Sequence, residues 1–236
     1  MPLRDHFHPP LSILRNWESL HALWAGEMVR TLNRGVLPDD CFAETQVHVG
    51  SRVEVDVAAF ERTPANGSAR GVAVATWSPP VTSLVIPAVF PDIMEVQVFR
   101  NFGGASLVAA VELVSPGNKD RPETRRAFVA KCASYLQQGI GLIIVDIVTD
   151  RLANLHNELI HFLQQPDNFT LPKAPPLYTT AYRPQRLETG DQIAMWLEPL
   201  TVGQPLPTMP LALRGVAVVP LDLDGTYQRT CEDSRL

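Results

Sequence analysis

Proline is spread very unevenly along this chain, and its distribution limits where regular structure can form. The 236 residues include 21 prolines, roughly 9% against a usual ~5%. Proline costs a backbone hydrogen bond in a helix interior or a central strand. None occurs at 11–37, 39–63, 92–115 or 123–165, whereas ten fall between Pro166 and Pro220. We therefore predict that the four proline-free windows hold the regular core.

The first window predicts a long amphipathic helix, because apolar residues recur at spacings of three and four. These residues are Ile13, Trp17, Leu20, Trp24, Met28 and Leu32. Gly35 and Pro38 mark the end of the helix. His21 lies on the apolar face, where the pattern favours a hydrogen-bonded core residue over a functional one.

Alternating apolar and polar residues predict two strands in the second window, at 45–49 and 52–57. The alternation places three valines on one face and two carboxylates, Glu54 and Asp56, on the other. Further on, 62–92 is expected to form a loop with one strand at 71–76. The alternating segment 94–100 predicts another strand that ends in a glycine turn at 101–104.

A strand–helix–strand unit follows. The segment 106–115 is almost entirely apolar, which is typical of a strand buried on both faces, and only Glu112 interrupts it. We expect a polar turn at 116–122, a helix at 123–138 and a second buried strand at 141–148. A unit of this length predicts two parallel strands.

Beyond a further helix at 151–165, the proline-rich remainder is expected to hold only short strands, at 192–197 and 213–219. We predict a core at 1–165 and, at 166–236, an extension that covers the same domain. No apolar run approaches the ~18–20 residues that span a bilayer, and the first residues lack an apolar signal core. The three cysteines lie far apart and show no paired spacing. These features predict a soluble cytoplasmic protein with free thiols.

The net charge of −5 argues against a surface that is uniformly basic. Residues 119–131 nevertheless hold five Lys or Arg against two acidic residues. Such a local basic patch can bind phosphate in an acidic chain. A solvated helix face is at least as good an explanation.

Glu112 is the strongest chemical signal in the sequence, because a carboxylate in an apolar strand is costly to bury unless it is paired or binds a cation. Asp56 is a second acid on a polar strand face. Mg²⁺ favours one or two carboxylates together with water and phosphate oxygens. Lys119 and Lys131 follow Glu112 closely enough to approach it and stabilise developing negative charge. The alternative is a structural salt bridge between Glu112 and a lysine, which composition alone slightly favours.

Other polar residues carry weaker signals. Ser115 and Asn118, at the end of the strand, suit phosphate binding or orientation of Glu112, and equally suit capping of the next segment. His156 and His161 are five residues apart on a helix, which puts them on different faces. Tyr135 is read as a core residue.

The stretch 111–119, followed by Lys131, Tyr135, Gly139 and Asp146, resembles the signature of the DUF4058 family of bacterial proteins. The spacing of four between Lys131, Tyr135 and Gly139 is also similar to that of the Uma2 (DUF820) family. The segment 17–21, the strand around Asp56 and the proline run at 205–211 extend the DUF4058 likeness over most of the chain.

Both families resemble branches of the PD-(D/E)xK restriction-endonuclease-like fold, an α/β (α+β) fold with an αβββαβ core and a mixed sheet. The resemblance implies that Asp56 and Glu112 bind Mg²⁺. Since Val114 stands where the usual lysine would be, it also implies that Lys131, or else Lys119, is the catalytic lysine. Ser115, Asn118 and His21 then line the substrate site. One of the acids on the first helix, Glu18 or Glu27, is a weak further candidate.

Two functional hypotheses remain. The first is a metal-dependent nuclease that hydrolyses phosphodiester bonds in DNA. The second is a catalytically inactive binding or scaffold module with the same fold, in which Glu112 and a lysine form a structural pair. Val114 and the scarcity of Lys and Arg outside 119–131 favour the second.

Overall fold

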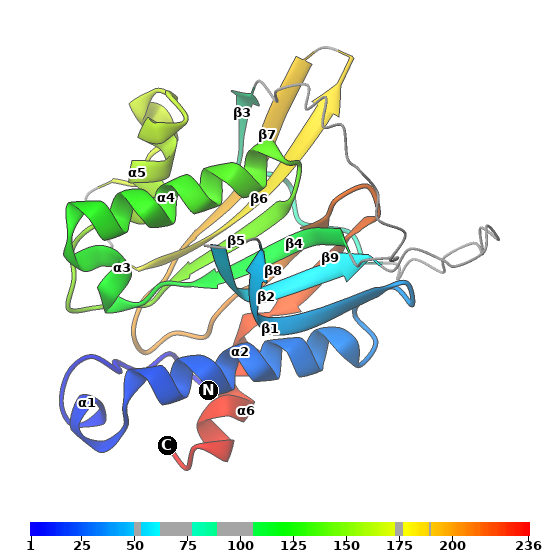
Figure 1. Cartoon of the computed structure of the whole chain (residues 1–236). Helices are drawn as coiled ribbons and strands as arrows, with labels where there is room; N and C mark the ends of the chain where they lie inside the picture. The colour runs from blue at the N-terminus through cyan, green and yellow to red at the C-terminus, as the bar shows by residue number, and fades with distance from the viewer. Residues whose placement is uncertain (50–52, 62–76, 89–105, 173–176, 189) are drawn as a thin grey trace.

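The computed structural model of the chain describes residues 1–49, 53–61, 77–88, 106–172, 177–188 and 190–236. Its centre is a mixed sheet of seven strands, covered on both faces (Figure 1). In spatial order the strands are β1 (Cys41–Val49), β2 (Val53–Glu61), β4 (Ser106–Leu113), β5 (Gly141–Asp146), β6 (Tyr178–Leu187), β7 (Gly190–Pro199) and β3 (Leu84–Ala88). Strands β4 and β5 are parallel, as predicted, and the other neighbours in the sheet are antiparallel.

Helices and a small hairpin form the outer layers (Figure 1). One face of the sheet packs against α4 (Pro122–Gln137) and α5 (Leu155–Phe162), beside the short α3 (Pro116–Asp120). The other face packs against α2 (Trp17–Asn33), α6 (Leu223–Asp233) and the hairpin of β8 (Thr208–Leu213) and β9 (Ala217–Asp222). The four-residue α1 (Leu11–Leu14) precedes α2, and a 3-10 turn covers Asp167–Phe169. The fold is therefore a mixed α/β arrangement.

The long N-terminal helix is confirmed as α2, although it begins only at Trp17. Asn16 caps it by accepting a hydrogen bond from the backbone N–H of Glu18. The apolar stripe is buried, and Trp24 donates its indole N–H to Thr226 of α6 at 3.0 Å. Ile13 lies outside this helix and is exposed. The helix covers the sheet through a single stripe, which is what the spacing of its apolar residues predicts.

The strand–helix–strand unit is confirmed, with one correction. The segment 116–122 does not form a polar turn throughout, because residues 116–120 form α3. Pro116 fits the first position of that helix, where no backbone N–H is required. Asn118 and Ser115 close the helix start with reciprocal hydrogen bonds. The glycine at the end of α4, Gly139, has a φ of 75° and allows the turn into β5.

The proline-rich C-terminal part is more regular than predicted. Strands β6 and β7 are ten residues long and extend the main sheet, and a hairpin replaces the single strand expected at 213–219. Pro184 lies within β6 at a position beyond the end of its pairing with β5, so no ladder hydrogen bond is lost on that side. Helix α5 is shorter than the expected 151–165.

Several expectations fall outside the described residues. These are the strands at 71–76 and 94–100, the turn at 101–104, the junction at 50–51 and the direction of the Glu54 side chain. Among the described residues, no helix is long and apolar enough to cross a membrane.

Candidate functional site

The two acids singled out in the sequence lie side by side on neighbouring strands. Strands β2 and β4 are antiparallel and pair Val57 with Val111, so the next step of the ladder brings Asp56 opposite Glu112. Ala58 and Ala110, which pair on the other side of Val57 and Val111, lie two residues from Asp56 and Glu112 and therefore on the same face of the sheet. Both alanines belong to the core beneath α4 and α5. The carboxylates therefore face the same helical layer, at the point where β4 ends.

Helix α4 brings Lys131 to this point. Its Nζ donates a hydrogen bond to Glu112 Oε2 at 2.7 Å. The Glu112 side chain is 2% exposed, while that of Lys131 is 20% exposed. Burial lowers the pKa of Lys131, but the Glu112 carboxylate more than compensates and the pKa is raised overall. Lys131 is thus a protonated donor that connects the buried acid to the surface.

Glu112 keeps acceptor capacity that its neighbours leave unused. Within the described residues, its Oε1 atom is buried and has no hydrogen-bond partner, and the same holds for the hydroxyl of Tyr135. Burial raises the pKa of Glu112 to about 8; Lys131 opposes this shift and the charge of Asp56 adds to it. Burial and the Glu112 charge likewise raise the pKa of Tyr135. An unsatisfied buried oxygen calls for an explanation. The Tyr135 hydroxyl, which interacts with Glu112, is one candidate donor, and an absent cation or water is another.

His21 reaches the site from the opposite layer. Its Nε2 lies 3.2 Å from the carbonyl oxygen of Leu113 and 3.4 Å from Asp56 Oδ1. The other Asp56 oxygen, Oδ2, accepts a hydrogen bond from the backbone N–H of Leu113 at 2.7 Å. Burial lowers the pKa of His21, but the hydrogen bond and charge of Asp56 raise it overall. His21 therefore positions Asp56 against the end of β4.

Lys119 does not join this cluster. Its Nζ donates to Asp146 Oδ2 at 2.7 Å, and both side chains are completely buried. Asp146 Oδ1 accepts from the backbone N–H of Val148. Burial raises the pKa of Asp146 to about 6, and Lys119 opposes the shift. Of the two candidate lysines, only Lys131 contacts Glu112.

The remaining candidates are distributed as follows. Asn118 Oδ1 accepts from both the N–H and the hydroxyl of Ser115, so these two residues mainly satisfy each other. Val114 is buried in the layer beneath α4. Glu18 is exposed, and Glu27 is bound by Arg30 and Arg229 at the contact between α2 and α6.

The two later histidines also lie apart, as expected. His156 is buried, with Nδ1 2.6 Å from the Tyr182 hydroxyl and Nε2 3.0 Å from the Phe169 carbonyl. His161 lies at the surface beside Asp167. The basic window at 119–131 is divided in the same way, because Arg121 and Arg126 are exposed whereas Lys119 is buried.

The cluster offers a divalent cation two carboxylates and little else from side chains. In the described part of the chain, no group of three or more His, Cys, Asp or Glu is placed to hold a metal ion. Mg²⁺ commonly binds through one or two carboxylates and keeps several waters. The unpartnered Glu112 oxygen beside Asp56 fits that mode, and does not fit a closed site made only of protein ligands.

Sequence reasoning missed the partner of Lys119. The signal was present, because Asp146 is a carboxylate at the end of an apolar strand, as Glu112 is.

Compared with models of protein families, with curated proteins and with solved structures, the chain matches none of them.

Proposed function

We propose that the chain is a Mg²⁺-dependent phosphodiesterase acting on DNA, with Asp56, Glu112 and Lys131 as its site. The observation that carries the proposal is the buried, unpartnered Glu112 Oε1 on the strand next to Asp56. Both acids also interact with groups that hold them in place, Lys131 for Glu112 and His21 for Asp56. The site is therefore ordered before any ligand binds.

The fold supports the same proposal. The chain runs through α2, β1, β2, β3, β4, α3, α4 and β5. Without the short α3 and without β3, which lies at the far edge of the sheet beside β7, this order resembles the αβββαβ core. Asp56 lies on the second of the strands that remain and Glu112 on the third. The resemblance to DUF4058 and Uma2 rests on the same residues, 111–119 and the spaced Lys131, Tyr135 and Gly139. Fold likeness alone does not establish a reaction, so the proposal depends on the site.

Hydrolysis would add one water across a phosphodiester bond. A new bond forms between the water oxygen and phosphorus, the bond to the leaving oxygen breaks, and that oxygen takes up a proton. Mg²⁺ held by Asp56 and Glu112 would stabilise the negative charge on the phosphate oxygens. Lys131, protonated and 20% exposed, would donate hydrogen bonds to the water or the phosphate. His21 would keep Asp56 in position.

A second candidate is an inactive binding or scaffold module. The direct 2.7 Å pairing of Lys131 with Glu112 favours it, because that contact already satisfies one carboxylate oxygen. In this case the pair is structural and the site needs no cation.

Calorimetric titration with Mg²⁺ and Mn²⁺, paired with cleavage assays on plasmid and oligonucleotide DNA, separates the two. We expect metal binding and metal-dependent cleavage in the wild type, both lost in Glu112→Gln and Asp56→Asn. Glu232→Gln, an exposed acid on α6, is the matched control and should behave as the wild type. If the folded wild type neither binds metal nor cleaves DNA, the nuclease proposal fails and the scaffold function remains.

A further inference from the structure

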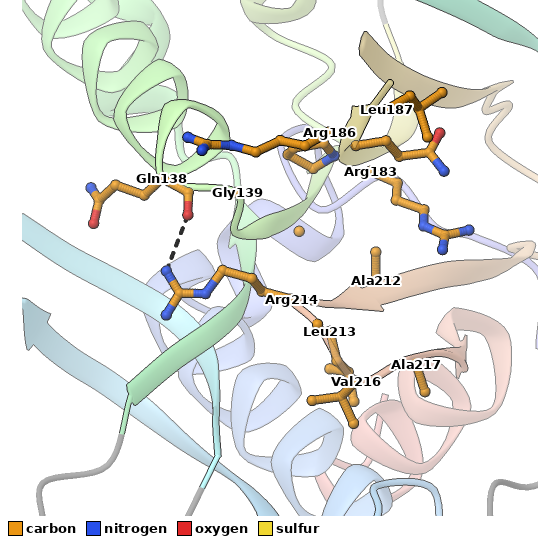
Figure 2. A pocket seen from close by; sticks show the side chains of 14 residues that line it. Gln138, Gly139, Arg183, Arg186, Leu187, Ala212, Leu213, Arg214, Val216 and Ala217 are labelled. Carbon is orange, nitrogen blue, oxygen red and sulfur yellow. Dashed lines mark hydrogen bonds between the residues drawn. The ribbon is translucent and has the colours of Figure 1, made fainter. Parts of the chain in front are cut away.

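A concave site lies at the other end of the parallel strands, away from the acidic cluster. It is a pocket of about 700 Å³ at the start of β5, between the end of α4, the end of β6 and the turn of the β8–β9 hairpin (Figure 2). Gly141 opens β5 and pairs in register with Ala109, three residues before Glu112. The pocket is thus displaced from the acidic cluster by about 10 Å along the strands.

The pocket is basic in an acidic chain. Arg183 and Arg186 of β6 and Arg214 of the hairpin turn are among the fourteen residues that line it, and none of those fourteen carries a carboxylate. Figure 2 shows Arg186 and Arg214 extending toward Gln138 and Gly139, with Arg183 on the opposite side of the hollow. The site therefore presents positive charge from two sides.

Arg214 is held in place before any ligand binds. Its Nη1 donates to the carbonyl oxygen of Gln138 at 3.1 Å, and its Nη2 donates to the Ser106 hydroxyl at 2.8 Å. Arg214 packs against Gly139, where an added Cβ would lie in ordinary contact, 3.4 Å from Arg214 Cδ. A guanidinium has five N–H donors, so Arg214 retains donors for a ligand.

Arg183 contributes the unused charge. In the part of the chain that the structure describes, its guanidinium makes no hydrogen bond or ion pair. Arg186 differs, because it lies opposite Asp191 in the β6–β7 ladder and has interactions of its own. The argument therefore rests on Arg183 and Arg214, and Arg186 adds only its positive charge.

The rest of the lining combines an apolar part with the polar side chains of Gln138 and Gln185. Pro184, Leu187 and residues of the hairpin supply the apolar part. Gly141 permits the close approach, because a Cβ on it would lie 1.9 Å from the Ala212 carbonyl oxygen. The pocket's volume falls within the ~300–1,000 Å³ usual for small-molecule sites, which combine apolar walls with a few placed polar groups.

We propose that this arginine pocket binds a small phosphate-bearing molecule of nucleotide size, with its phosphate on the arginines and its body against the apolar wall. Phosphate is the group that best uses two separate guanidinium groups, because it carries several acceptor oxygens and up to two charges. The proposal is independent of the acidic cluster, and neither site needs the other to be correct.

Calorimetric titration with ADP tests the proposal, with adenosine and inorganic phosphate as partial ligands. We expect ADP to bind with a dissociation constant below about 1 mM and both partial ligands to bind at least tenfold more weakly. Arg183→Gln should weaken ADP binding by about tenfold or more, since it removes charge-assisted hydrogen bonds. Arg34→Gln, an exposed arginine at the end of α2, is the matched control and should bind ADP as the wild type does.

Arg214→Gln should also weaken binding, but it removes contacts to Gln138 and Ser106 and so tests folding as well. Arg183→Gln avoids that ambiguity. Absence of ADP binding, or equal binding by wild type and Arg183→Gln, would overturn the proposal. The proposal would also be overturned if the wild type bound an oligonucleotide but not ADP, and Arg183→Gln abolished the oligonucleotide binding. The pocket would then be part of a nucleic-acid surface. Glu112→Gln should bind ADP normally, so a failure of the nuclease proposal would remain distinct.

Discussion

Two acid–lysine pairs lie at the neighbouring ends of β4 and β5, and they differ in how completely they are closed. Both join a lysine Nζ to a carboxylate oxygen at 2.7 Å. In the Lys119–Asp146 pair both side chains are fully buried, and each carboxylate oxygen has a donor. In the Glu112–Lys131 pair the lysine is 20% exposed, and Glu112 Oε1 has no partner within the described residues.

The contrast shows that a buried ion pair does not by itself identify a functional site. Asp146 satisfies the condition that Glu112 does, an acid at the end of an apolar strand, yet it is closed by its neighbours. What distinguishes Glu112 is spare acceptor capacity together with a second acid, Asp56, on the adjacent strand. The closed pair therefore serves as an internal reference for the open one.

Removing the lysine of the closed pair should have the largest effect. Lys119→Met leaves Asp146 without its cation in a site with no access to solvent, and we expect a loss of about 3–5 kcal/mol in the free energy of unfolding. Urea denaturation at pH 7 measures it. The double variant Lys119→Met, Asp146→Leu should recover most of that loss. If Lys119→Met lowered the free energy of unfolding by less than Lys131→Met does, the comparison would be reversed.

The same change in the open pair should cost less. We expect Lys131→Met to lower the free energy of unfolding by about 1–2 kcal/mol at pH 7, the range for one lost hydrogen bond to a buried polar group. The cost is limited because burial raises the pKa of Glu112 and Lys131 opposes that rise, so Glu112 can hold a proton once its cation is gone. Parallel urea denaturation of the two lysine variants gives the ranking directly.

Much of the central fold could be predicted because it depends on local patterns. The spacing of apolar residues gave the helix that includes Trp24, and the continuous apolar runs gave β4 and β5 as parallel buried strands. The C-terminal part was predicted to hold only short strands because proline was taken to interrupt longer ones, whereas β6 and β7 are each ten residues long. Pro184 tolerates its position only because β5 ends before reaching it, which is a tertiary fact.

The grouping of the candidate residues was predicted in part for a similar reason. Glu112 and Asp56 each stand out against their own strand, and Lys131 lies within reach through the following helix. Which lysine meets which acid depends instead on the turn after β4, where α3 directs Lys119 toward Asp146. The arginine pocket gave no sequence signal, since Arg183 and Arg214 are thirty-one positions apart and line the same pocket only because the sheet and the hairpin pack together.

The dependence of stability on pH should distinguish the two acids further. Between its ordinary pKa of 4.5 and about 8, Glu112 is ionised in the unfolded chain and protonated in the folded one, so stability falls as pH rises. We expect the advantage of wild type over Glu112→Gln to shrink by up to about 1.4 kcal/mol per pH unit from pH 5 to 8. The stability advantage of wild type over Asp146→Asn should shrink in the same way as pH rises, but only up to about pH 6. Urea denaturation of the three proteins across this pH range checks both expectations. If the two differences stopped changing at the same pH, the two acids would not differ as we expect.

The smallest expected effect concerns the coupling between the two acids of the open site. Asp56→Asn keeps an oxygen for the Leu113 N–H but removes the charge that helps to raise the pKa of Glu112. We expect that pKa to fall by on the order of 0.5 pH unit, while the pKa of Asp146 stays unchanged. A carbon-detected NMR titration of the side-chain carboxyls measures both, with Glu112→Gln used to assign the signal. If the Glu112 pKa stayed unchanged or rose, the carboxylates of Asp56 and Glu112 would not interact. The Glu112–Lys131 pair would then be a structural ion pair, as the Asp146–Lys119 pair is.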